Sequence, residues 1–91
     1  MSLTFRPCVV IPCYNHGAMM ARVLARLQPF DLPCIVVDDG SSEETRLQLN
    51  ELAAREPNLT LIRLAKNAGK GVAVIRGLQA AAEAGYSHAV Q

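Results

Sequence analysis

The chain has 91 residues, of which 51% are hydrophobic and 19% are charged, a balance typical of one small globular domain and not of a disordered segment. Nine Lys and Arg against eight Asp and Glu give a net charge of +1, and the basic residues are scattered along the chain, which argues against a nucleic-acid-binding surface. No apolar run approaches the roughly 20 residues of a membrane span and no signal peptide is recognisable, so we expect no membrane segment in this piece and a place in the cytoplasm or on the cytoplasmic face of a membrane.

The first predicted element is a strand buried on both faces. Residues 8–15, CVVIPCYN, are apolar and rich in β-branched side chains, and Pro12 and the turn-prone Asn15 stop the run. An amphipathic helix is predicted from His16 to Gln28, because apolar side chains recur there at helical spacing and Pro29 follows. Those apolar side chains are Met20, Val23, Leu24 and Leu27.

The second predicted strand, residues 33–39, ends on two adjacent carboxylates, Asp38 and Asp39. The sequence GSSEE follows, with a turn glycine and a predicted capping box from Ser41 to Glu44. The helix that starts there should run to about Arg55 before a Pro-Asn pair ends it. Its inward-facing residues should be Leu49, Leu52 and Ala53.

The last part of the chain predicts one more strand, one helix and the start of a further strand. Residues 59–64, LTLIRL, are less uniformly apolar and so predict a strand near a sheet edge. An Ala-rich helix is predicted at residues 72–84, with Gly85 as its C-cap, and HAVQ at 88–91 begins a fourth strand. Strands alternating with helices through short connections predict an α/β fold, a parallel sheet with helices on its faces. The helix carries Val72, Ile75 and Leu78 on one face.

Three cysteines, an odd number, lie within or beside the apolar runs rather than in a metal-ligand spacing. They are Cys8, Cys13 and Cys34. We expect small buried thiols in a reducing compartment.

Three loops should meet at one edge of this sheet. The segments 12–16, 38–41 and 66–71 each follow a strand directly, and ligands of parallel sheets bind outside the carboxyl ends of the strands. Carboxylates only accept hydrogen bonds, so Asp38 and Asp39 suit a ligand edge that offers N–H donors, such as that of uracil or guanine. The segments therefore predict one nucleoside-binding site.

Other side chains of these loops have both a binding and a structural interpretation. The ring of Tyr14 suits a base or a sugar, but it also fits a core position at the strand end. Lys70 and its neighbouring glycine amides suit a carbonyl or phosphate oxygen, but they also fit a solvated turn. Asp38 fits a helix cap, and His16 fits a helix start better than a ligand-binding role.

Known phosphate-binding and phosphoacceptor motifs do not match. The segment GKGVAV has Val74 where a dinucleotide-binding fingerprint needs its third glycine. A Walker loop would need a glycine at Leu64 and a Ser or Thr at Gly71. A receiver domain would need a phosphoacceptor Asp after the third strand, where the chain has Ala65 and Lys66.

Three motifs in order, VVIPCYN, IVVDDGSSEET and NAGKGVAVIRGL, resemble the N-terminal half of family 2 glycosyltransferases with a GT-A fold, including dolichyl-phosphate mannosyltransferase-like members. The resemblance covers nearly the whole chain. It implies a three-layer Rossmann-like half domain with strand order 3-2-1-4. It also implies that residues 1–91 are the N-terminal nucleotide-binding part of a catalytic domain, cut before an Asp-x-Asp motif.

By this resemblance, Pro12, Tyr14 and Asp39 would hold the base and ribose of a UDP- or GDP-sugar, and Asp38 would support the loop. Lys70 or Asn67 would add a contact to the base or the diphosphate. Where mannosyltransferase-like members have a Glu, this chain has His16, so no contact carries over to that position. The full predicted nucleotide-binding set is Pro12, Tyr14, Asn15, Asp38, Asp39, Gly40, Asn67 and Lys70.

The resemblance also implies a divalent cation, Mg²⁺ or Mn²⁺, to offset the charge of the leaving nucleoside diphosphate. Its ligands would lie in the Asp-x-Asp motif, outside this chain, so we expect the piece alone to be inactive and to self-associate through its exposed sheet edge. Two other interpretations stay open. One is a noncatalytic nucleotide-binding or interaction module, and the other a structural α/β piece in which the 38–39 turn is a helix cap.

Overall fold

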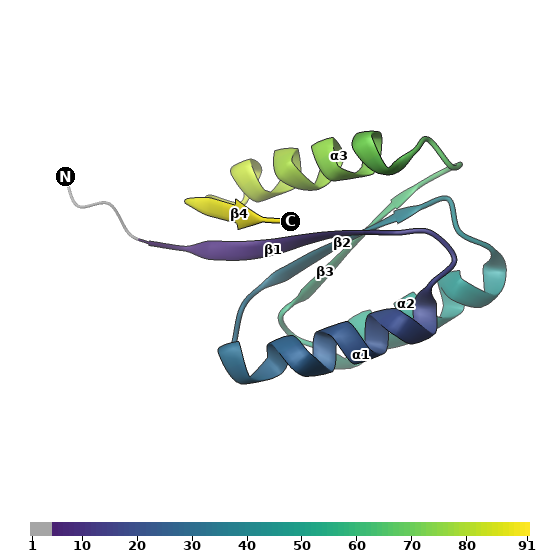
Figure 1. Cartoon of the computed structure of the whole chain (residues 1–91), viewed down its shortest axis with the longest axis horizontal. Coiled ribbons are helices and arrows are strands. Elements are labelled where there is room, and N and C mark those ends of the chain that lie inside the picture. The colour runs from purple at the N-terminus through teal and green to yellow at the C-terminus, as the bar shows by residue number, and fades with distance from the viewer. Residues whose placement is uncertain (1–4) are drawn as a thin grey trace.

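A sheet of four parallel strands in the order β3-β2-β1-β4 forms the middle layer of the molecule. The computed structural model describes residues 5–91. Helices α1 and α2 cover one face of the sheet and α3 covers the other (Figure 1). The predicted α/β class, three-layer arrangement and strand order are confirmed, including the edge position of β3. The elements are β1 (Pro7–Cys13), α1 (Gly17–Leu27), η1 (Gln28–Phe30), β2 (Cys34–Asp39), α2 (Glu43–Arg55), β3 (Leu59–Leu64), α3 (Lys70–Glu83) and β4 (His88–Val90).

Alternation along the strands divides the core into two clusters. Successive side chains of a strand point to opposite faces of the sheet. In β2, Cys34 and Val36 pack against α1 and α2, whereas Ile35 and Val37 pack against α3. All six residues of β2 are buried, as expected of a central parallel strand. This alternation also fixes the direction of the polar side chains at the strand end.

The first strand is shorter than predicted. It ends at Cys13, so Tyr14 and Asn15 lie in the loop before α1. Asn15 has a φ of 57°, in the left-handed region that Asn tolerates better than most residues, and this conformation ends the extended backbone. The predicted helix after it is confirmed, with Met20 and Leu24 buried in the core.

The predicted capping box at the start of α2 is wrong. The N-cap is Ser42 rather than Ser41, and its side chain makes no capping hydrogen bond. The Ser41 hydroxyl instead accepts a hydrogen bond from the backbone N–H of Asn15, at 3.0 Å. Glu43 and Glu44 lie in the first turn of α2, where their charges favour the positive end of the helix dipole.

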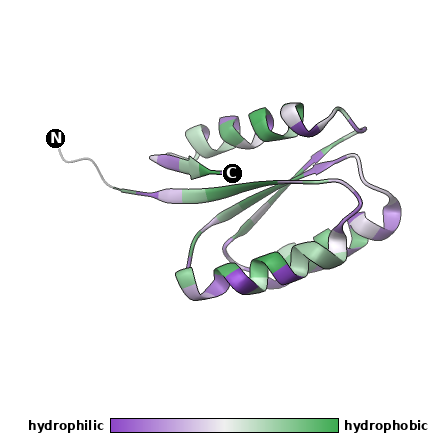
Figure 2. Cartoon of the chain, viewed as in Figure 1, coloured by the Kyte–Doolittle hydropathy of each residue, from purple (hydrophilic) through white to green (hydrophobic). Residues whose placement is uncertain are grey.

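Helix α3 begins at Lys70, two residues before the predicted start of 72, and packs on the sheet through small side chains. Ala73, Gly77 and Ala81 are buried, and a Cβ atom on Gly77 would collide with Val10 and lie 3.1 Å from Val37 Cγ2. Close approach to the sheet thus selects small residues. The larger apolar side chains predicted on one face are exposed. Figure 2 shows that much of α3 is made of hydrophobic residues. Val72, Ile75 and Leu78 are 49%, 57% and 42% exposed.

The three cysteines are buried and free, as predicted. Burial raises the pKa of each thiol, which keeps the thiols protonated and unreactive. Within residues 5–91, the helices are all too short or too polar to cross a bilayer.

Candidate functional site

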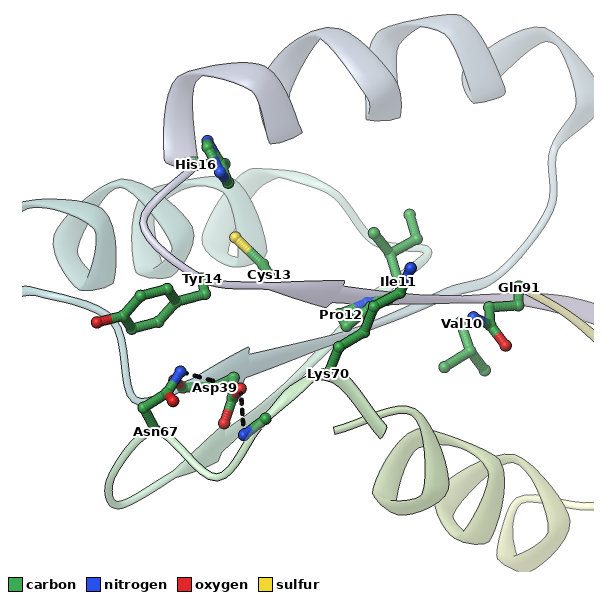
Figure 3. A pocket seen from close by; sticks show the side chains of 11 residues that line it. Val10, Ile11, Pro12, Cys13, Tyr14, His16, Asp39, Asn67, Lys70 and Gln91 are labelled. Atoms are coloured by element: carbon green, nitrogen blue, oxygen red, sulfur yellow. Dashed lines mark hydrogen bonds between the residues drawn. The ribbon is translucent and has the colours of Figure 1, made fainter. Parts of the chain in front are cut away.

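A cavity of about 670 Å³ lies at the carboxyl ends of β1 and β2, facing the start of α3 (Figure 3). Its wall combines the second half of β1, the end of β2, the loop that precedes α3 and the first residue of that helix. Five of the eight predicted nucleotide-binding residues line it. They are Pro12, Tyr14, Asp39, Asn67 and Lys70.

The two adjacent carboxylates have separate surroundings because neighbouring strand residues face opposite ways. Asp38 is fully buried on the side of α1 and α2, outside the cavity. Its Oδ2 accepts a hydrogen bond from Arg63 Nε at 3.2 Å, and its Oδ1 accepts one from the Ser41 N–H at 3.0 Å. Asp38 therefore braces the β2–α2 turn.

Asp39 faces the cavity, yet its side chain is bound to the protein. Oδ1 accepts a hydrogen bond from the Ala68 N–H at 2.7 Å. Oδ2 accepts two more, from the Gly69 N–H at 3.0 Å and from Asn67 Nδ2 at 3.1 Å. Figure 3 shows Asn67 and the loop backbone turned toward this carboxylate. The residue is only 3% exposed, so Asp39 joins the end of β2 to the β3–α3 loop.

Gly40 does not line the cavity, but it allows the β2–α2 turn and the β3–α3 loop to pack closely against each other. Its φ of 68° is in the left-handed region, where glycine has no steric penalty. A Cβ atom on Gly40 would collide with the backbone of Lys66 and Asn67. The β3–α3 loop can therefore pass directly over this glycine.

Asn15 also lies outside the cavity, and it ties the β1–α1 loop to the β2–α2 turn. Its Oδ1 accepts a hydrogen bond from the Ser42 N–H at 2.8 Å, while its own N–H donates to Ser41 Oγ. These two hydrogen bonds join residues that lie 26 and 27 positions apart in the sequence, and together they connect the two loops. Of the predicted set, Asn15, Asp38 and Gly40 thus hold the loops around the cavity in place.

Lys70 supplies positive charge at the cavity wall and forms no ion pair within residues 5–91. Figure 3 shows its side chain extending from the start of α3 toward Ile11 and Pro12 of β1. Within residues 5–91 the only ion pair is that of Arg63 with Asp38, and the first turn of α3 contains no acid. A cation at the positive end of a helix dipole is electrostatically unfavourable. The Asp39 carboxylate, which accepts a hydrogen bond from the N–H of the N-cap Gly69, offsets part of this, and a bound anion would offset more.

Several cavity residues were not in the predicted set. β4 pairs with β1 only from Pro7 to Val9, so beyond Val9 one edge of β1 has no neighbouring strand among the described residues. Val10, Ile11 and Cys13 of β1 line the cavity, together with His16 and Gln91.

Across residues 5–91 there is no group of three His, Cys, Asp or Glu side chains that could hold a metal ion. The described residues therefore do not fit a divalent-cation site by themselves. We assign none of them to a metal.

Comparison with known proteins gives a consistent result. The glycosyl transferase family 2 model matches residues 8–84. An uncharacterized protein of Methanocaldococcus jannaschii is 36% identical over 69 residues, which cover 75% of this chain and 30% of that protein. The dolichol-phosphate mannosyltransferase of Pyrococcus furiosus is 35% identical over 77 residues, covering 80% of this chain and 22% of the enzyme.

Among solved structures, a mannosyltransferase from Pyrobaculum calidifontis in complex with GDP-Man and Mn²⁺ superposes with a TM-score of 0.71 at 26% identity. The match covers 85% of this chain and 25% of that protein. The chain spans less than a third of the length of each of these relatives.

Proposed function

Because the chain belongs to glycosyl transferase family 2, we propose that it forms the donor-binding part of a glycosyltransferase catalytic domain. It would hold a nucleotide-diphospho-sugar, from which the whole protein transfers the sugar to an acceptor. The observation that carries the proposal is the cavity at the carboxyl ends of β1 and β2, which combines an aromatic ring, the N-terminus of α3 and a lysine that forms no ion pair within residues 5–91. Residues 1–91 would then be the N-terminal nucleotide-binding part of that domain.

The nucleoside would lie at the Tyr14 end of the cavity. The Tyr14 side chain is about half exposed, so its ring has a free face for a base or ribose and a hydroxyl that can hydrogen-bond. Pro12 adds a rigid apolar wall beside it. The base could be that of UDP or GDP, and the Pyrobaculum mannosyltransferase, whose structure was solved in complex with GDP-Man, supports a nucleotide-sugar ligand of this class.

The diphosphate would lie toward α3. Lys70 is the first residue of that helix, and the free backbone N–H groups of a helix N-terminus favour a phosphate oxygen. Lys70 contributes a compact positive charge next to these groups. Because Lys70 forms no ion pair within residues 5–91, an anionic diphosphate could bind to this charge directly.

A divalent cation in the whole enzyme remains a proposal, supported by the Mn²⁺ that accompanies GDP-Man in the Pyrobaculum complex. Such a cation would stabilise the negative charge of the leaving diphosphate. A location in the cytoplasm, or on the cytoplasmic face of a membrane, likewise stays a prediction.

Titration of the ¹⁵N-labelled chain with UDP and GDP tests the proposal. We expect saturable amide shifts around Tyr14, Asn67 and Lys70, with little change at the opposite end of the sheet. The variant Lys70→Gln should weaken binding of the nucleotide about tenfold, as expected for loss of one charge-assisted contact. Arg76→Gln, which removes a positive charge from the same helix outside the cavity, serves as the matched control.

The possible results separate three interpretations. Shifts confined to the cavity support a donor site. Binding without any transferase activity in the full-length protein would favour a noncatalytic nucleotide-binding module. If neither nucleotide causes saturable amide shifts, the proposal is overturned. The turn at residues 38–39 would then have a structural role only.

A further inference from the structure

We propose that Arg6 and Ser87 are positioning residues that hold β4 on β1 in one register and thereby place Gln91 in the wall of the cavity. Each of the two directly precedes a strand, at the end of the sheet away from the cavity, and neither lines it. The inference rests on the proposed function only where it concerns a bound nucleotide; the register itself does not depend on any ligand.

The packing of β4 alone leaves its register weakly defined. The strand has three residues, all exposed, and within residues 5–91 it pairs with β1 only, over three residue pairs. Register is strongly specified where one face of a strand is buried, because a shift by one residue would turn its apolar side chains to the wrong face. Since β4 has no buried face, contacts outside the strand must fix how it lies on β1.

Ser87 supplies the first of these contacts. Its N–H donates to the Arg6 carbonyl oxygen at 2.9 Å, and its hydroxyl oxygen accepts a hydrogen bond from the Arg6 N–H at 2.7 Å. The hydroxyl also hydrogen-bonds to His88 Nδ1 at 2.8 Å. A shift of β4 by one residue would set Tyr86 or His88 opposite Arg6. Neither side chain has a hydroxyl close to its own backbone, so neither could replace Ser87.

The side chains of Phe5 and Arg6 contact the residues on either side of Ser87. Arg6 Nη1 donates to the Gly85 carbonyl oxygen at 3.4 Å, and the guanidinium carbon lies 5.2 Å from the centre of the Tyr86 ring, a distance that suits a cation–π interaction. The rings of Phe5 and His88 lie 4.9 Å apart, between their centroids. Each of the residues 85–88 is therefore in contact with Phe5 or Arg6.

The end of α3 fixes the direction from which the chain reaches Ser87. Gly85 has a φ of 84°, in the left-handed region, and its N–H donates to the Ala82 carbonyl oxygen at 3.1 Å. The Tyr86 N–H donates to the Ala81 carbonyl oxygen at 3.1 Å. These two bonds form a Schellman motif, which ends the helix in a defined turn. The connection from α3 to β4 is thus held at both of its ends.

The register reaches the cavity through Gln91. Val90 is the register partner of Val9, so Gln91 comes next, beside Val10. Val10 packs on the α3 side of the sheet, and register partners face the same side, so Gln91 is directed to that side and lines the cavity (Figure 3). Its amide group offers a ligand both donors and an acceptor. A shift by one residue would put Val90 in this place and turn Gln91 to the other face.

Amide exchange of the ligand-free chain tests the attachment. In Ser87→Ala the Arg6 amide loses its acceptor and should exchange about fivefold faster, together with the β4 amides that pair with β1. Ser87→Thr keeps the hydroxyl and should restore the wild-type rates. Ser42→Ala is the matched control, because Ser42 is an exposed serine whose side chain makes no capping hydrogen bond. Unchanged exchange in Ser87→Ala would overturn the proposal.

Nuclear Overhauser effects between the two strands report the register directly. In the wild type, the contacts of Val90 should be those of a single register, with Val9 as its partner. In the double variant Arg6→Ala/Ser87→Ala these contacts should weaken or be joined by a second set from a shifted strand. One unchanged set in the double variant would mean that the three strand pairs fix the register by themselves, and the proposal would be wrong.

Titration with UDP or GDP separates this inference from the proposed function. In the wild type a bound nucleotide should shift the Gln91 amide together with those of Tyr14 and Lys70. Ser87→Ala should make the Gln91 shift at saturation at least about twofold smaller and leave the other two unchanged, since only β4 changes its place. Equal changes at all three amides would contradict a role through β4. If the wild type binds neither nucleotide, the donor site is refuted, while amide exchange and Overhauser contacts still decide the register.

Discussion

Replacing Gly40 with alanine tests whether the β2–α2 turn and the β3–α3 loop can pack together only because residue 40 has no side chain. Gly40 has a φ of 68°, and a Cβ atom there would lie 2.8 Å from Lys66 Cα and collide with the neighbouring carbonyl carbon and the Asn67 nitrogen. All these atoms belong to the backbone, so no rotamer change can relieve the contact. The β3–α3 loop would have to move away.

The expected cost has two parts. A left-handed conformation costs a non-glycine residue roughly 1–2 kcal/mol. Overpacking against atoms that cannot rotate away adds about 1–3 kcal/mol. We therefore expect Gly40→Ala to lower the free energy of unfolding by about 2–5 kcal/mol, a large share of the stability of a small domain.

Urea denaturation followed by circular dichroism measures this loss, and the amide spectrum of residues 66–69 shows whether the loop has moved. Gly71→Ala is the matched control, because a Cβ atom there meets nothing within 4 Å and the residue lies in α3. Alanine should stabilise that helix by about 0.5–1 kcal/mol. A Gly40→Ala variant as stable as the wild type, with unshifted loop amides, would refute the close-contact reasoning.

Three further predictions concern charge, pH and association. Arg63→Ala should lower the free energy of unfolding by about 1 kcal/mol, because it leaves one oxygen of the buried Asp38 without its partner. The Arg63 side chain is 32% exposed, so solvent screening keeps this loss small. An unchanged midpoint of urea denaturation would contradict the prediction. Burial raises the pKa of the three thiols above their ordinary 9.0, so the unfolded chain loses these protons first. The contribution of the thiols to stability should be constant below pH 9.0 and be lost as the pH rises through the folded-state values, and replacing the cysteines with alanine should remove this alkaline loss. The open edge of β1 beyond Val9 and the exposed strand β4 should promote self-association, and a purely monomeric chain in sedimentation velocity would contradict that.

The fold was predictable because its signals are local. Each buried strand is a short apolar run, each helix has apolar side chains at helical spacing, and each ends at Pro, Gly or Asn. The face of α3 that packs on the sheet was harder to predict. Three of its four buried residues, Ala73, Gly77 and Ala81, are small because the helix lies close to Val10 and Val37, and that distance is set by the sheet rather than by the helix sequence. The larger Val72 and Ile75 are therefore the exposed ones.

The site was only partly predictable for a related reason. The sequence indicates which loops meet, but not which side chains bind each other across them. Ser41 fits a capping box in the sequence, yet its hydroxyl bonds to Asn15, 26 residues away. The bonds of Asp39 to the loop before α3 span about as many residues and leave no local pattern. Such contacts exist only once the strands are aligned.

The alignment of β2 decides the roles of both acids. Cys34 and Val36 face one helical layer and Ile35 and Val37 the other, so alternation sends Asp38 to the side of α1 and α2 and Asp39 to the cavity. A shift of the strand by one residue would exchange the two carboxylates. It would also move the apolar side chains between two cores of different shape, at a cost far above that of one hydrogen bond. The apolar residues of β2 therefore determine which acid reaches the cavity, and substitutions in the core of this strand should disturb the loop before α3 even though they touch no residue of it.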